Sequence, residues 1–112
     1  MCDTIKKIEE VRFSGVINSR GRLVAGGMKE GLESLENERE SKTNYMELAL
    51  RVKMRKEFDK QLGPVNFALA SRQKCLEMTF PIKHDDLLYV FAEPDSDYSI
   101  LPLKIISIVN EQ

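Results

Sequence analysis

Few side chains in this sequence are of the types that carry out covalent catalysis. The chain has one histidine, His84, and two cysteines, Cys2 and Cys75. A nucleophilic cysteine or serine needs a nearby base, so His84 is the only imidazole that could activate Cys75. Cys75 belongs to an apolar segment, where cysteines usually pack in the core. We therefore predict a protein that is not an enzyme, and keep catalysis by Cys75 and His84 as an alternative.

Three further patterns resemble ligand sites without meeting their requirements. The trio His84-Asp85-Asp86 is contiguous, whereas zinc sites usually take four ligands and aspartates commonly shape turns. The alternating carboxylates from Glu93 to Asp97 lack the glycine and the distant glutamate of a calcium-binding loop. The glycines between Gly21 and Gly31 are not followed by the Gly-Lys-Ser/Thr of a phosphate-binding loop. The sequence therefore predicts neither a metal site nor a cofactor.

Composition and charge describe an ordinary folded domain. Hydrophobic residues make up 42% of the 112 residues and charged residues 31%, which is typical of one globular domain spanning residues 1–112. Seventeen basic against eighteen acidic residues give a net charge of -1, which argues against nucleic-acid binding. No stretch approaches the roughly 18 apolar residues of a membrane span. The cysteines form no paired pattern, so we expect a reducing, cytoplasmic location.

A cluster of basic residues lies within a predicted long helix. Arg51 and Arg55 are four residues apart, as are Lys56 and Lys60, so each pair shares one side of the helix. These four residues are our candidates for binding an acidic partner protein. Nearby carboxylates dilute the cluster, so a solvated helix face is one alternative. A second alternative is intramolecular, with the glutamate-rich segment Glu30–Glu40 lying against this helix.

The residues before this helix predict a short helix and a β-hairpin. Apolar residues at helical spacing indicate a helix over Thr4–Val11. Two apolar runs, Phe13–Ile17 and Leu23–Ala25, flank a turn in which Gly21 can take the positive φ that a tight hairpin needs. Gly26-Gly27 then marks the exit from the hairpin.

The long helix is expected to span Asn44–Leu62. The acidic stretch Glu30–Glu40 before it predicts a solvated loop with some helical character. Ser41 and Thr43 can accept hydrogen bonds from free backbone N–H groups, so we expect one of them to cap the helix.

Two apolar stripes run along this helix. The first consists of Tyr45, Leu48, Ala49 and Val52. The second consists of Met46, Leu50, Met54, Phe58 and Leu62. A helix on a single sheet needs an apolar arc of only about 100°, so the second stripe is available for a partner. The alternative is that its methionine-rich edge fills an irregular core.

The rest of the chain predicts three strands and a final helix. Apolar and polar residues alternate over Phe67–Ala70 and Cys75–Ile82, as in two strands of a meander. After the turn at residues 84–86, Leu87–Ala92 is continuously apolar, which is typical of a central strand covered on both faces. Residues 100–109 favour a helix, although their β-branched content also suits a sixth strand.

This order of elements resembles the Roadblock / dynein light chain superfamily, and more closely its uncharacterised small archaeal members. The resemblance covers nearly the whole chain and rests on Val16–Gly27 (VINSRGRLVAGG), on the helix end Leu62-Gly63-Pro64 and on the strand at Leu87–Phe91. It implies an α+β, profilin-like sandwich with a five-stranded antiparallel sheet of order 2-1-5-4-3, a long central helix and short terminal helices. The segment Glu30–Glu40 departs from the family pattern by lengthening the connection into the long helix.

The resemblance also implies a homodimer. In that arrangement the long helices pack side by side, which makes Met46, Leu50 and Met54 interface candidates. The strand that contains Phe67 and Leu69 extends the sheet into the partner, and an uncharged edge strand favours such pairing.

By resemblance, the function is that of a non-enzymatic scaffold or interaction module, regulating a small Ras-like GTPase or serving in a larger protein assembly. The alternative is a small-molecule sensor of profilin/PAS-like architecture. A sensor would hold a cavity between sheet and helices, lined by residues such as Phe67, Met78 and Phe91.

Overall fold

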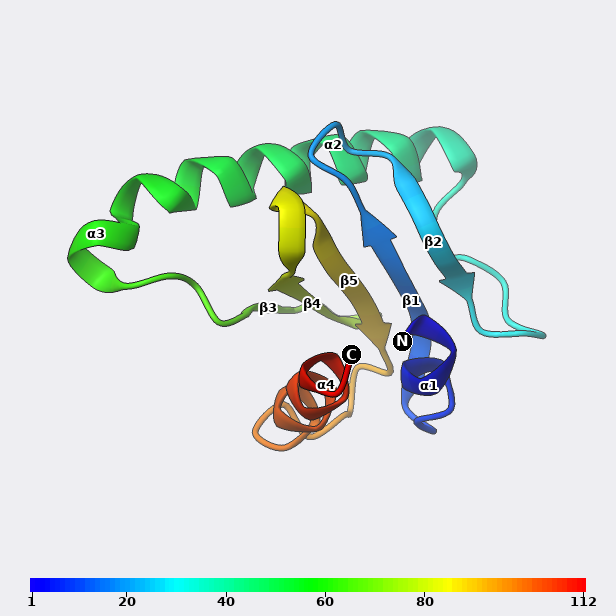
Figure 1. Ribbon diagram of the computed structural model, residues 1–112. Coiled ribbons are helices and arrows are strands. Elements are labelled where there is room, and N and C mark those ends of the chain that lie inside the picture. Colours follow the sequence, from blue (N-terminus) through cyan, green and yellow to red (C-terminus); the bar gives the residue numbers. More distant parts are fainter.

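A five-stranded antiparallel sheet lies between two layers of helices in the computed structural model, which describes residues 1–112 (Figure 1). Its order, β2-β1-β5-β4-β3, confirms the predicted topology. Helix α2 (Glu38–Arg55) covers one face, and α1 (Cys2–Lys6) and α4 (Leu101–Asn110) cover the other. The strands are β1 (Val11–Ile17), β2 (Leu23–Met28), β3 (Ala68–Ser71), β4 (Leu76–Pro81) and β5 (Leu87–Ala92).

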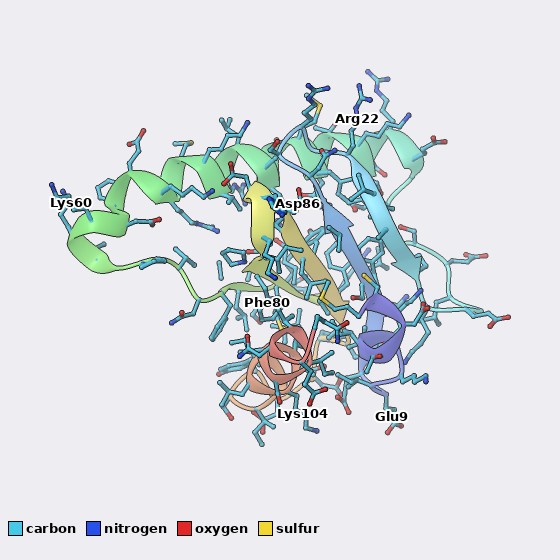
Figure 2. All side chains as sticks on the ribbon, viewed as in Figure 1. Glu9, Arg22, Lys60, Phe80, Asp86 and Lys104 are labelled. Atoms are coloured by element: carbon cyan, nitrogen blue, oxygen red, sulfur yellow. The ribbon has the colours of Figure 1, made fainter.

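The central strand, β5, separates two cores, as its continuous apolarity predicted. Leu88 and Val90 belong to a cluster of 12 buried residues on the side of α1 and α4. Leu87 and Tyr89 belong to a cluster of 7 buried residues beneath α2. Figure 2 shows Phe80 of β4 directed toward α4, within the larger cluster. Successive strand residues point to opposite faces, so an apolar run with no alternation serves both cores.

The β1–β2 hairpin turns at the predicted glycine but extends further than expected. Gly21 has a φ of 79°, and the Asn18 side chain accepts hydrogen bonds from two backbone N–H groups of the turn. Gly26 and Gly27 lie inside β2, so their assignment to the hairpin exit was wrong. A Cβ at Gly26 would lie 2.1 Å from the Ser14 carbonyl oxygen, so the glycine there permits close approach to β1.

Helix α2 begins six residues earlier than predicted, at Glu38 instead of Asn44. Asn37 caps this helix. Its side chain accepts a hydrogen bond from the backbone N–H of Glu40, and the Glu40 carboxylate accepts a hydrogen bond from the backbone N–H of Asn37. Such a reciprocal pair satisfies two backbone donors, and carboxylates in the first turn suit the helix dipole. The prediction that Ser41 or Thr43 caps the helix was therefore wrong.

Three other boundaries differ from the predictions. The long helix breaks after Arg55 into a 3₁₀ turn (Lys56–Phe58) and α3 (Asp59–Leu62), before Gly63 ends it at a φ of 80°. The first helix covers residues 2–6 instead of 4–11, because Val11 already pairs in β1. Phe67 and Ile82 lie just outside β3 and β4. The last segment is a helix, α4, as favoured.

Candidate functional site

The second apolar stripe is exposed to solvent along the outer face of α2, which carries Met46, Leu50 and Met54, and continues through the 3₁₀ turn and α3 with Phe58 and Leu62. The exposed fractions are 63% for Met46, 58% for Leu50, 57% for Met54, 56% for Phe58 and 81% for Leu62. The first stripe, Tyr45, Leu48, Ala49 and Val52, is buried against the sheet. The helix is thus apolar on two sides, and its methionine-rich edge does not fill the core. A contiguous apolar surface of this kind on a folded chain is typical of an interaction site.

The strand β3 lies at the edge of the sheet and pairs only with β4. Its backbone on the other side is therefore free to pair with a further strand. Phe67 and Leu69 are half-buried and pack on the cluster beneath α4, where the Phe67 ring lies 6.0 Å from that of Phe80. The backbone edge of β3, together with the exposed residues Ala70 and Ser71, faces solvent.

The four basic candidates have different surroundings. Lys56 pairs with Asp85 in the β4–β5 turn, and this hydrogen bond holds the pKa of the Asp85 carboxyl below its usual range. Arg51 lies 3.9 Å from Glu47. Arg55 is half-buried and Lys60 projects from α3 (Figure 2), and neither makes an ion pair. The acidic segment Glu30–Glu40 ends in the first turn of α2, away from these residues.

A chain of hydrogen bonds links α2 to the sheet beneath it. The Tyr89 hydroxyl donates to Glu77 Oε2 at 3.0 Å, and Asn44 Nδ2 donates to the Tyr89 oxygen at 2.9 Å. The same Asn44 amide donates to Glu36 at 3.4 Å. Arg72 Nε lies 3.3 Å from Glu77 Oε2. Burial and the nearby negative charge of Glu77 raise the pKa of Tyr89, so its hydroxyl stays protonated as the donor.

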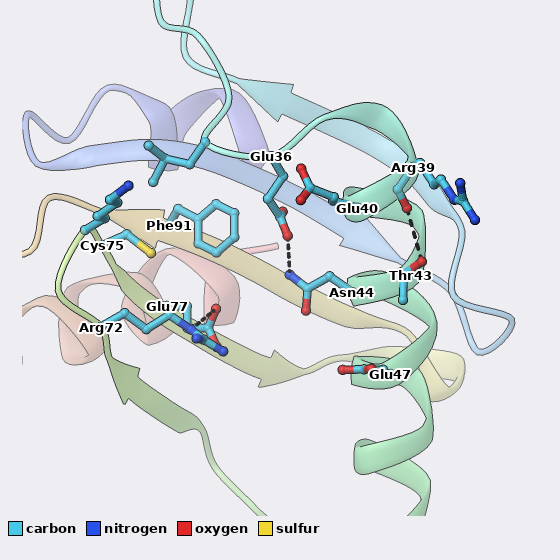
Figure 3. A pocket seen from close by; sticks show the side chains of 12 residues that line it. Glu36, Arg39, Glu40, Thr43, Asn44, Glu47, Arg72, Cys75, Glu77 and Phe91 are labelled. Carbon is cyan, nitrogen blue, oxygen red and sulfur yellow. Dashed lines mark hydrogen bonds and ion pairs between the residues drawn. The ribbon is translucent and has the colours of Figure 1, made fainter.

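A cleft of about 530 Å³ opens beside this chain, between the N-terminal half of α2 and the β3–β4 turn (Figure 3). The sheet side is formed by the β3–β4 turn with Cys75, Glu77 and Phe91. The α2 side supplies Glu36, Arg39, Glu40, Thr43, Asn44 and Glu47. Sequence reasoning did not find this site. The three residues named for a sensor cavity do not line one site, because Met78 and Phe67 pack in the cluster beneath α4 while Phe91 packs under α2 and lines this cleft.

The structure does not assemble the catalytic alternative. Cys75 precedes β4 and His84 follows it, and six strand residues at about 3.3 Å each place them roughly 20 Å apart. Burial raises the pKa of the Cys75 thiol, which disfavours the reactive thiolate. No group of three or more histidine, cysteine, aspartate or glutamate side chains could hold a metal ion. None of the helices combines the length and apolarity that crossing a bilayer requires.

Comparison with known proteins identifies the fold. The sequence profile of a family described as a family of unknown function (DUF6659) matches residues 1–112. A search of the curated proteins finds no match. Among solved structures, Myxococcus xanthus MglB has a TM-score of 0.74 at 13% identity, covering 98% of this chain and 86% of that chain.

Two further solved structures agree. A Roadblock/LC7 domain from Streptomyces avermitilis has a TM-score of 0.72 at 10% identity, covering 98% of this chain and 89% of that chain. The gliding protein MglB from Thermus thermophilus has a TM-score of 0.73 at 13% identity, covering 99% of this chain and 87% of that chain. These likenesses confirm the predicted Roadblock fold.

Proposed function

The chain belongs to this family of unknown function, DUF6659, and we propose that it works as a non-enzymatic, homodimeric interaction module. The exposed apolar stripe on the outer face of α2 carries the proposal. A second copy related by a twofold axis would place the same stripe opposite it, as isologous interfaces do. Full burial of an exposed apolar side chain contributes about 1.5–3 kcal/mol, so these partly exposed side chains each contribute a fraction of that, against the entropic cost of association.

In this arrangement residues 1–112 form one domain, and two copies pack through α2 and β3. Met46, Leu50 and Met54 form the helical part of the interface, and the free edge of β3 pairs with its counterpart. Phe67 and Leu69 hold the β3 segment in position, because both side chains pack against the cluster beneath α4. A solved structure of similar fold, MglB with a tetrameric arrangement, supports association between copies.

The mass of the protein in solution tests the homodimer. The chain is expected to sediment at twice the mass of one copy, and Leu50→Glu to reduce this to one copy. Leu103→Glu is the matched control, because Leu103 is 61% exposed on α4 against 58% for Leu50 on α2. A wild-type protein that stays monomeric at high concentration, or a control that dissociates equally, contradicts the proposal.

The partner that we propose for this dimer is a small Ras-like GTPase, bound along α2 and α3. Arg55 and Lys60 support the idea, since neither is neutralised by an ion pair within the chain. Arg51 and Lys56 would complete the basic surface by releasing Glu47 and Asp85, their carboxylate partners within the chain, and pairing with carboxylates of the GTPase instead.

Binding of purified small GTPases, each loaded with GDP or with a GTP analogue, tests this partner. We expect one nucleotide state to bind better, and Lys60→Glu to weaken that binding without changing the mass of the dimer. Lys7→Glu is a charge-matched control, because Lys7 is exposed at the end of α1, and α1 covers the other face of the sheet from α2. A dimer that captures no GTPase in either state contradicts the partner but leaves the homodimer standing.

A further inference from the structure

The α2 wall of the cleft carries negative charge that the chain itself does not neutralise. Glu36 is half-buried, and its carboxylate accepts only two long hydrogen bonds, of 3.4 Å, from Ser41 Oγ and Asn44 Nδ2. No cationic side chain lies within ion-pair distance of it. The guanidinium of Arg39 points away from the cleft (Figure 3). A carboxylate held by neutral donors alone retains its capacity for a charged partner.

The sheet wall adds a buried carboxylate with unused bonding capacity. The Glu77 side chain is only 10% exposed, and one oxygen, Oε2, receives both the Tyr89 hydroxyl and the Arg72 guanidinium. Its other oxygen, Oε1, accepts no hydrogen bond. Because a carboxylate offers about four lone-pair sites, Glu77 can take a further donor from inside the cleft.

The ring of Phe91 supplies a flat apolar surface between these two walls. Phe91 lines the cleft together with Glu36, Cys75 and Glu77 (Figure 3). The ring also contacts the Tyr89 ring edge-to-face at a centroid distance of 4.6 Å and the tilted Phe13 ring at 5.6 Å. Aromatic faces attract cations, and this attraction strengthens where water is partly excluded.

Aromatic surface and unneutralised carboxylates together favour one class of ligand. We propose that the cleft binds a small organic cation, whose ammonium, guanidinium or amidinium group bonds to Glu36 over the ring of Phe91, with Glu77 adding a second acceptor. A volume of about 530 Å³ is within the range of small-molecule sites. Two cationic side chains line the sheet side of the cleft: Arg72 pairs with Glu77, whereas Lys74 makes no ion pair and is a positive charge that a cationic ligand must avoid. The proposal is independent of whether the chain forms a dimer.

Three probes of one shape but different charge test the proposal: benzamidine (cationic), benzamide (neutral) and benzoate (anionic). Amide chemical shifts of the full chain, followed by NMR at about 0.15 M salt, report both affinity and location. We expect benzamidine alone to bind, with shifts confined to the first half of α2, the β3–β4 turn and the end of β5. Equal binding of benzamide or benzoate, or no binding of benzamidine, overturns the proposal.

Two variants and one control assign the contacts. Glu36→Gln keeps the shape of the side chain and removes the charge, so benzamidine should bind about tenfold more weakly, as for a lost charge-assisted hydrogen bond. Phe91→Leu should weaken it by several-fold, the scale of an exposed cation–π contact. Glu57→Gln removes an exposed carboxylate outside the cleft and should change nothing. If Glu57→Gln weakens binding as much as Glu36→Gln, the effect is general surface charge and the proposal fails.

Discussion

At the scale of single residues, the Tyr89 hydroxyl holds together the polar chain under α2. It donates to Glu77 and accepts from Asn44, and it is buried with the rest of its side chain. Tyr89→Phe removes this group and leaves a buried carboxylate and an amide without their shared partner. We expect the free energy of unfolding to fall by about 1–3 kcal/mol, measured by chemical denaturation. Tyr98→Phe, at a side chain 64% exposed, should change it by less than about 0.5 kcal/mol.

The same residue predicts how stability depends on pH. Burial raises the pKa of folded Tyr89 above the value of about 10 expected in the unfolded chain. Above that pH the unfolded chain loses the proton while the folded chain keeps it, so stability is fully present below about pH 10 and falls as pH rises. The free energy of unfolding between about pH 9 and 11 should therefore fall less steeply in Tyr89→Phe than in the wild type. Equal slopes would show that Tyr89 ionises without unfolding.

At the scale of elements, the start of α2 depends on the cap at Asn37. Asn37→Ala removes the acceptor for the Glu40 N–H group, so we expect a loss of about 1 kcal/mol in the free energy of unfolding. Asn37→Asp retains a capping oxygen and should retain most of the stability. Asn66→Ala, at an exposed position without a side-chain hydrogen bond, is the control for the loss of an asparagine. A cost shared by Asn37→Ala and Asn66→Ala would contradict the role of the cap.

Elements with one unambiguous pattern were predictable from the sequence, whereas element ends at which two patterns compete were not. The strand β5 was predicted with its observed limits, because its six apolar residues serve two cores at once. The start of α2 was missed because Asn37 and Glu40 form their capping box inside a run of glutamates that resembles a solvated loop. The break at Lys56–Phe58 was missed because the apolar stripe continues through it to Leu62.

The cleft could not be predicted for a different reason. Glu36, Glu77 and Phe91 come from three separate segments, and only the sheet order and the position of α2 bring them together. One signal was present in the sequence: Glu77 and Thr79 are the polar positions of an otherwise apolar strand. These two residues lie on the same face of β4, the face that carries the polar side chains. The register of β4 against β5, which pairs Glu77 with Phe91, was needed to use that signal.

At the scale of the whole molecule, α2 separates two surfaces with different roles. Its inner side packs on the sheet through four residues and borders the cleft, while its outer side leaves Met46, Leu50 and Met54 in solvent. A dimer formed through the outer stripe would therefore leave the hydrogen-bonded chain of Tyr89 intact. Leu50→Glu and the cleft variants can then be tested separately, because Leu50 does not line a cleft with Glu36 or Phe91.

The homodimer predicts that thermal stability depends on protein concentration. A partner copy that binds only the folded chain stabilises it by mass action, so the Tm of the wild type should rise as its concentration is raised. Leu50→Glu removes the apolar contact and exposes nothing new in the monomer, since Leu50 is already 58% exposed there. Its Tm should be lower at high concentration and independent of dilution. For a saturating partner, a hundredfold dilution should remove about 2.7 kcal/mol of stabilisation. A wild-type Tm that stays constant over that dilution would show that the outer stripe of α2 serves another partner.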